Sequence, residues 1–185
     1  MDTKDLWVLD GGMGRELARR GAPFRQPEWS ALALMEAPET VREVHQAYVA
    51  SGARVITTNS YALVPFHIGD ERFAADGERL AALAGQLARD VADGQAGAVQ
   101  VAGSLPPLFG SYRADLFKAD RVSELATPLI RALSPYVDIW LAETMSLIAE
   151  PLALKALLPD DGKPFWVSFT LEDEAPGSEP ALRSG

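Results

Sequence analysis

The 185-residue sequence predicts an α/β fold with a parallel sheet, of the type found in (β/α)8 TIM barrels. Three observations support this class: five short apolar runs recur along the chain, helix-like stretches separate most of them, and small polar residues follow each run. Strands buried on both faces read as continuous apolar runs, and parallel barrels carry their chemistry at the carboxyl ends of the strands. The runs cover residues 6–9, 53–56, 98–102, 137–142 and 164–169.

The stretches between the runs have the marks of helices. Pro38 suits the first turn of a helix, because its missing N–H is not needed there. Gly52 suits the left-handed position just after a helix. Apolar residues at helical spacing predict the helices between these signals and further along. Helices are expected over residues 38–50, 71–93, 120–134 and 146–158, with a short helical patch at 14–20 and a long loop at 105–118.

The number of strands bears on the domain organisation. Strands joined through helices are parallel and right-handed, but a closed barrel takes eight strands and about 250 residues. This sequence supplies about five parallel strands and four main helices. Either the sheet stays open or the chain is the first part of something longer. We expect residues 1–185 to form the N-terminal portion of a single barrel domain, with 172–185 as an exposed tail.

The bulk composition excludes several kinds of partner. A formal net charge of −9 argues against nucleic acid, which needs a basic protein face. No apolar stretch approaches the roughly 20 residues of a membrane span, and residues 1–5 do not begin a signal peptide. We therefore expect a cytoplasmic protein without a membrane partner. The sequence has no cysteine, which excludes disulfides and thiolate chemistry within it.

Seven segments, in order along the chain, resemble motifs of the homocysteine S-methyltransferase family. Each is weak alone, but together they match in order and spacing across nearly the whole chain. They are Leu9-Asp10-Gly11-Gly12-Met13-Gly14-Arg15-Glu16-Leu17, Trp29-Ser30, His45-Gln46-Ala47-Tyr48, Ile56-Thr57-Thr58-Asn59-Ser60-Tyr61, Val101-Ala102-Gly103-Ser104-Leu105-Pro106-Pro107, Leu141-Ala142-Glu143-Thr144 and Trp166-Val167-Ser168-Phe169-Thr170.

The resemblance implies a TIM barrel that transfers a methyl group from a small-molecule onium donor to the thiol of homocysteine, giving methionine. We expect S-methylmethionine or S-adenosylmethionine as the donor. The family activates the thiol with zinc held by three cysteines, one after strand six and a pair after strand eight. This sequence contains no cysteine, so no metal ligand and no catalytic residue can be assigned in it. We expect the chain by itself to hold no stoichiometric zinc and to show no turnover.

The resemblance also implies a substrate site. The acids that contact the amino acid substrate in the family match Asp10 and Glu143, and Gly11 and Gly12 would let the backbone approach a ligand. The polar group Thr57, Thr58 and Asn59 would line the same site. From the residues alone, simpler structural roles remain open: a plain turn at 10–12, a helix N-terminal acid at Glu143, and caps and turns at 57–59.

Two other interpretations of the whole chain, and one each of Ser104 and His45, follow from the same sequence. In one alternative, the chain is a non-catalytic, truncated barrel fragment that acts by associating with another chain. In the other, it is a different barrel enzyme that uses its two acids for acid–base chemistry. Ser104 is expected to cap or turn at a strand end. His45 falls in the first long helix, where we expect a packed interior histidine rather than a catalytic one.

Overall fold

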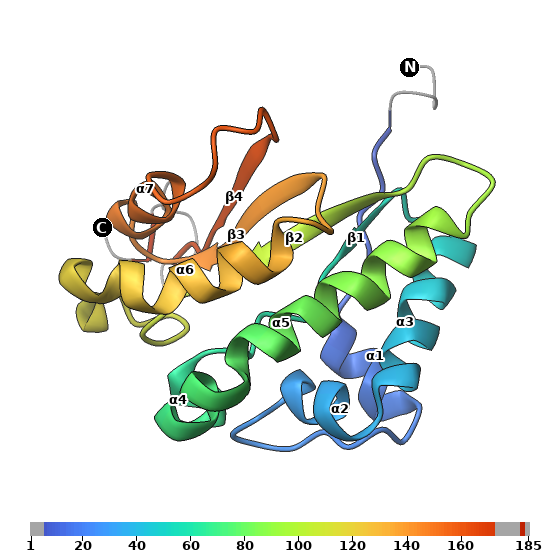
Figure 1. The fold of residues 1–185 in the computed structure, drawn as a ribbon, viewed down its shortest axis with the longest axis horizontal. Coiled ribbons are helices and arrows are strands. Elements are labelled where there is room, and N and C mark those ends of the chain that lie inside the picture. The colour runs from blue at the N-terminus through green and yellow to red at the C-terminus, as the bar shows by residue number, and fades with distance from the viewer. Residues whose placement is uncertain (1–5, 173–181, 184–185) are drawn as a thin grey trace.

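The sheet has four parallel strands in consecutive order along the chain. The structure is a computed structural model that describes residues 6–172 and 182–183. The strands are β1 (Val55–Thr57), β2 (Gln100–Leu105), β3 (Ile139–Met145) and β4 (Phe165–Phe169), which lie side by side in that order (Figure 1). In register, Ile56 lies opposite Val101, and Ala102 lies opposite Ile139. The predicted α/β class with a partial barrel wall is therefore confirmed.

The first apolar run differs from the prediction, because residues 6–9 do not form a fifth strand. Leu9 makes an isolated parallel bridge with Val55, and the Val8 carbonyl accepts N–H groups from Arg54 (2.7 Å) and Val55 (3.2 Å). Among the described residues, β1 is the one strand that forms backbone hydrogen bonds with this run, and Trp7 is 54% exposed. A regular ladder needs successive paired residues, whereas here the Asp10 N–H, which donates to the Val55 carbonyl over 2.9 Å, is the last backbone contact of the run with β1.

Helices connect the strands as predicted. α3 (Pro38–Ala50) precedes β1, α5 (Asp70–Asp93) joins β1 to β2, α6 (Val122–Leu133) joins β2 to β3, and α7 (Ala149–Lys155) joins β3 to β4. Figure 1 shows α5 and α6 running along one side of the sheet. Pro38 occupies the first turn of α3, where its fixed φ suits the helix.

Several shorter elements lie between these. α1 (Met13–Arg19) corresponds to the predicted helical patch, whereas α2 (Ser30–Glu36) and α4 (Pro65–Ile68) were not expected. Residues 30–34 of α2 are all buried, so this helix lacks the polar face that makes a periodic pattern readable. The predicted 105–118 loop contains the 3₁₀ turn η2 (Ala114–Leu116), and η3 (Ala119–Arg121) leads into α6.

Alternate residues of each strand face two different cores. Ile56, Val101 and Trp140 belong to the large core between the sheet and the helices. Val55 and Ile139 belong to a small cluster on the opposite face, which would be the inside of a barrel. This alternation is the period-2 geometry of a strand, and it directs one set of side chains toward the site.

His45 is fully buried in α3, as expected for a packed interior histidine. In the segment predicted as an exposed tail, Leu182 pairs with Leu171 and is partly buried, while 173–181, 184 and 185 lie outside the described residues. None of the helices in the described ranges has the length and apolar content needed to cross a membrane.

Candidate functional site

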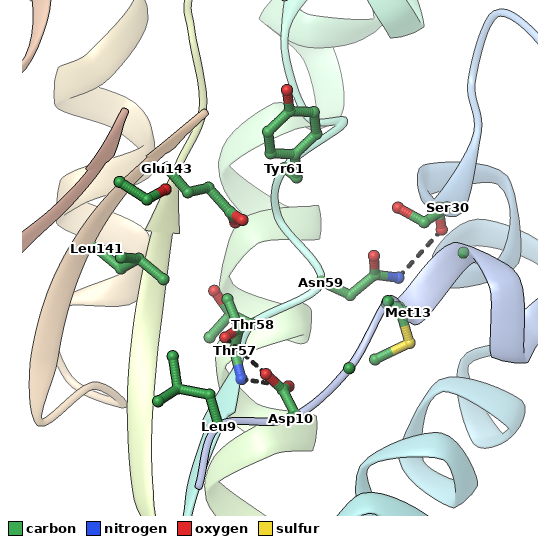
Figure 2. A pocket seen from close by; sticks show the side chains of 14 residues that line it. Leu9, Asp10, Met13, Ser30, Thr57, Thr58, Asn59, Tyr61, Leu141 and Glu143 are labelled. Atoms are coloured by element: carbon green, nitrogen blue, oxygen red, sulfur yellow. Dashed lines mark hydrogen bonds between the residues drawn. The ribbon is translucent and has the colours of Figure 1, made fainter. Parts of the chain in front are cut away.

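A cavity of about 470 Å³ opens at the carboxyl ends of the strands. All residues predicted to bind substrate line it: Asp10, Gly11, Gly12, Thr57, Thr58, Asn59 and Glu143. Figure 2 shows Asp10 on the segment before α1 and Glu143 on β3, reaching the cavity from different sides. Residues far apart in the sequence thus meet, because parallel strands end at the same edge. That these residues bind substrate remains a prediction.

Asp10 is held firmly by the end of β1. The Thr57 backbone N–H donates to Asp10 Oδ2 over 2.7 Å, and the Thr57 hydroxyl donates to Oδ1 over 3.0 Å (Figure 2). Burial nevertheless raises the pKa of Asp10 from 3.8 to about 6, against the opposing effect of these hydrogen bonds. The hydrogen bonds from Thr57 do not offset the effect of burial, so a nearby cation would still stabilise the ionised form of the Asp10 carboxylate.

Glu143 lies inside β3 rather than at the start of a helix. The strand continues to Met145, and a register shift between Ala142 and Met145 marks a bulge at this point. Thr144 within the bulge has a φ of +61°, which is uncommon for a non-glycine residue. Bulges re-aim side chains, and this one accompanies the turn of Glu143 into the cavity. The helix-terminus explanation for Glu143 is therefore wrong, since α7 begins only at Ala149.

The Glu143 carboxylate is buried and paired with a hydroxyl. Ser104, fully buried in β2, donates its hydroxyl to Glu143 Oε1. Burial raises the pKa of Glu143, the Ser104 bond lowers it, and the negative charge of Asp10 raises it further. The turn or cap expected of Ser104 is wrong, because its hydroxyl supports an acid of the cavity. The negative charges of the two carboxylates repel each other, so a cation bound between them would stabilise the ionised form of both.

The polar residues after β1 form the frame of the cavity rather than a helix cap. The Thr58 hydroxyl accepts the Ser104 backbone N–H over 3.0 Å and shares a hydrogen bond with Ser60. Asn59 donates from its side-chain amide to the Ser30 carbonyl over 3.1 Å, which ties β1 to α2. Both Thr58 and Asn59 are almost fully buried. They hold the strand ends in place and leave only part of their surface to a ligand.

The two glycines after Asp10 differ in their surroundings. A Cβ on Gly11 would lie 2.8 Å from the Tyr48 ring, so this glycine is needed for packing against α3. A Cβ on Gly12 would meet nothing within 4 Å. Tyr48 also donates its hydroxyl to the Gly12 carbonyl over 3.2 Å. Both glycines line the cavity; the missing side chain allows packing against Tyr48 at Gly11 and leaves open space at Gly12.

A second cavity of about 440 Å³ adjoins the first, and we call it the aromatic cavity. The two cavities share Gly14, Ser30, Tyr61 and Glu143. Rings dominate the remaining wall, and the ring-bearing residues are Phe24, Trp29, Tyr61, His67 and Tyr112. Burial lowers the pKa of His67, against the opposing effect of its hydrogen bond with the Pro27 carbonyl. Sequence reasoning missed this cavity, although Trp29 and Tyr61 both lie within the quoted motifs.

Further residues of the first cavity were not predicted. Met13, Leu141 and Ser168 line it, the last two from the inward-facing positions of β3 and β4. Leu141 and Ser168 could have been predicted from the sequence. Side chains two residues apart in a strand point to the same face, and each of these residues is two positions from an inner-face residue of its strand.

A zinc site does not fit the residues present. Across residues 6–172 and 182–183, no group of three or more His, Cys, Asp or Glu side chains could hold a metal ion. The sequence has no cysteine to supply the thiolates that the family resemblance implies. Among the described residues, the two cavities together therefore provide two carboxylates that could bind a cation, and an aromatic wall, but no set of metal ligands.

Fold and site together define a class: a partial (β/α)8 barrel with a cavity at its strand ends that is lined by two acids. The family profile described as "Homocysteine S-methyltransferase" matches residues 7–185. The chain belongs to the homocysteine S-methyltransferase family, as its motifs predicted.

Individual relatives agree with this assignment. The chain is 34% identical to the homocysteine S-methyltransferase of Escherichia coli, over 94% of this chain and 61% of the relative. It is 31% identical to homocysteine S-methyltransferase YbgG of Bacillus subtilis, again over 94% of this chain and 61% of the relative. The chain thus spans about three fifths of the length of these curated relatives.

Solved structures support the fold. The metallated form of the homocysteine methyltransferase MmuM from Escherichia coli superposes with a TM-score of 0.81 at 33% identity, covering all of this chain and 68% of that one. The oxidised form of MmuM gives a TM-score of 0.78 at 32% identity.

Proposed function

We propose that this chain forms the homocysteine-binding wall of a methyltransferase that moves a methyl group from an onium donor to the homocysteine thiol. One observation carries the proposal: Asp10 and Glu143, which lie far apart in the sequence, line one cavity, and burial raises the pKa of each. Their carboxylates would pair with the α-ammonium of homocysteine, because a nearby cation favours the ionised form of a desolvated acid. α1 begins just after Gly12 without a side-chain cap, and the N–H groups of a first helical turn have no intrahelical acceptors, so they would bind the α-carboxylate.

The aromatic cavity supports an onium donor. A sulfonium cation is attracted to the faces of Trp and Tyr rings, which Trp29 and Tyr61 provide. Because Tyr61 and Glu143 border both cavities, a donor methyl group would lie next to the bound thiol. S-methylmethionine and S-adenosylmethionine both carry the required sulfonium.

The reaction is a direct displacement. The homocysteine sulfur attacks the methyl carbon, the bond from that carbon to the donor sulfur breaks, and the electron pair stays on the donor. The thiol proton is released, and methionine is the product. This chain's residues bind and align the two reactants, which removes an entropic barrier. No ligand for the family's zinc is present, so we assign no thiol-activating step to this chain.

The ammonium contact is testable with a matched ligand pair. L-Homocysteine and 4-sulfanylbutanoate differ only in the amino group, and calorimetric titration of the purified chain compares them. We expect the desamino compound to bind at least about tenfold more weakly, as is typical for loss of one charged hydrogen bond. Equal affinities, or no homocysteine binding at all, would contradict the proposed function.

A second candidate function is association with another chain to complete the barrel wall. Two exposed apolar features favour it, because exposed sheet edges promote strand pairing: the run at residues 6–9, and Phe169 at the end of β4 with Leu171 just after it. Light scattering of the purified chain should then show a species larger than 19.9 kDa. Zinc analysis and a methyl-transfer assay on the same sample complete the test. Stoichiometric zinc with turnover in a monomeric chain would refute this second function.

A further inference from the structure

We propose that Glu150 is a positioning residue for the aromatic cavity: it holds the chain after β2 so that Ser111 and Tyr112 form part of the cavity wall. The identity of the ligand in that cavity rests on the proposed function, whereas the positioning itself does not. Glu150 is outside every motif that carried the family resemblance, and its side chain does not line either cavity.

The contact is a single buried hydrogen bond. Glu150 lies in the first turn of α7, and its Oε1 accepts the Leu108 backbone N–H over 2.8 Å. Glu150 is only 6% exposed and Leu108 only 2%. This bond joins α7 to the segment leaving β2, two elements that are separated by α6 and β3 along the chain.

The carboxylate is expensive to bury at this position. No basic side chain forms an ion pair with Glu150 within the described ranges, and burial raises its pKa while the Leu108 N–H lowers it. A buried charge without a cation partner destabilises a fold unless it satisfies another group. Here the satisfied group is the Leu108 N–H, which would otherwise be a buried donor without an acceptor.

Leu108 lies three residues before the cavity wall. Phe109 packs edge-on against Phe117, with ring centroids 5.9 Å apart, and Gly110 takes a φ of +152° that turns the chain. The Ser111 hydroxyl then lies 2.7 Å from the Tyr61 hydroxyl, and Tyr112 joins the wall at a φ of +63°.

The segment from Leu108 to Tyr112 thus has an anchor near each end. Glu150 supplies the first anchor, and Tyr61, which borders both cavities, supplies the second. With the first anchor lost, Tyr112 keeps the neighbouring Ser111–Tyr61 hydrogen bond and the Arg183 guanidinium over its ring, 5.3 Å from the centroid, but its strained backbone loses the support before it. We therefore expect loss of Glu150 to disturb the aromatic cavity and to spare the homocysteine cavity.

The experiment compares Glu150→Ala with Glu150→Gln in the full chain. The amide oxygen of Gln keeps an acceptor for Leu108, whereas Ala removes it. Asp138→Ala is the control, because Asp138 Oδ2 also accepts a backbone N–H, that of Val101, over 2.9 Å, at the opposite end of the sheet; this variant in addition removes the ion pair of Asp138 with Arg89 (2.9 Å). Amide exchange is measured for residues 108–112, and NMR titrations use L-homocysteine and, separately, trimethylsulfonium as an onium probe without an amino acid portion.

We expect Glu150→Ala to speed amide exchange at Leu108 and to weaken trimethylsulfonium binding by about tenfold, the effect of one buried hydrogen bond. Homocysteine affinity should not change. Glu150→Gln should keep the amide exchange at Leu108 and the trimethylsulfonium affinity of the unaltered chain. Asp138→Ala should leave exchange at residues 108–112 and both affinities as in the unaltered chain.

Other outcomes would overturn the inference in distinct ways. Unchanged exchange at residues 108–112 in Glu150→Ala refutes the anchoring role. Equal losses of homocysteine and trimethylsulfonium affinity indicate general unfolding instead of positioning. If the unaltered chain binds neither ligand, the proposed function fails for this chain, while the exchange comparison still decides whether Glu150 holds the segment.

Discussion

Replacing Asp10 by Asn should weaken homocysteine binding and stabilise the ligand-free fold in the same variant. Asn keeps an oxygen to accept the Thr57 N–H, and its amide can donate to the Thr57 hydroxyl, so both contacts of Asp10 have counterparts. What the variant removes is the negative charge that we assign to the substrate ammonium. A hydrogen bond to a charged group contributes about 1.5–3 kcal/mol, which predicts an affinity about ten to a hundred times weaker.

The stabilisation follows from the raised pKa of Asp10. The folded chain holds the proton more tightly, with a pKa of about 6 against an ordinary 3.8, so it binds more protons than the unfolded chain between these values. Stability is therefore present below pH 3.8 and is lost as pH rises through about 6. The shift corresponds to about 3 kcal/mol at pH 7, a cost that the Asn variant does not carry.

Urea denaturation at pH 7 and pH 4, together with calorimetric titration of homocysteine, measures both effects. At pH 7 the free energy of unfolding should rise by up to about 3 kcal/mol, and at pH 4 the gain should fall below about 1 kcal/mol. Equal homocysteine affinity in both proteins would refute the ammonium contact. A loss of stability at pH 7 would refute the account of a desolvated carboxylate.

Three further predictions concern the same region. Glu143→Gln keeps an acceptor for the Ser104 hydroxyl but should weaken homocysteine binding by about tenfold in the same titration; unchanged affinity would remove Glu143 from the site. His45→Leu should remove the destabilisation that His45 causes as pH falls from 6.5 to about 4, because burial lowers the His45 pKa to about 4; in urea titrations the change in stability over that interval should be about 3 kcal/mol less favourable for the unaltered chain than for the variant. Gly11→Ala should destabilise the fold by about 1–3 kcal/mol through contact with Tyr48, whereas Gly12→Ala should leave the thermal midpoint unchanged and weaken homocysteine binding; the reverse pattern would contradict the different roles of the two glycines.

Much of the fold was readable before the structure. The apolar runs at residues 53–56, 98–102, 137–142 and 164–169 correspond to the four strands, and their order along the chain is their order in the sheet. Buried parallel strands and amphipathic helices leave local patterns, because each element's burial repeats with its own period. α2 left no such pattern, because residues 30–34 are all buried.

The sequence by itself determined which segments form parallel strands, and that the residues after Ile56 and Leu141 lie at one edge of the sheet. Parallel strands joined by helices end at a common edge. That Asp10 reaches the same cavity as Glu143, from a segment that forms no strand, was decided by the tertiary structure. The motifs also determined the family.

Only the tertiary structure decided which polar groups meet within that edge. The bulge at Thr144, the Ser104 hydroxyl on Glu143, and the Glu150 carboxylate on the Leu108 N–H all depend on contacts between distant segments. The same holds for residues 6–9, which fail to form a strand despite a strand-like pattern, because a ladder requires partners as well as propensity. Such pairings are set by packing in three dimensions, and no local period in the sequence records them.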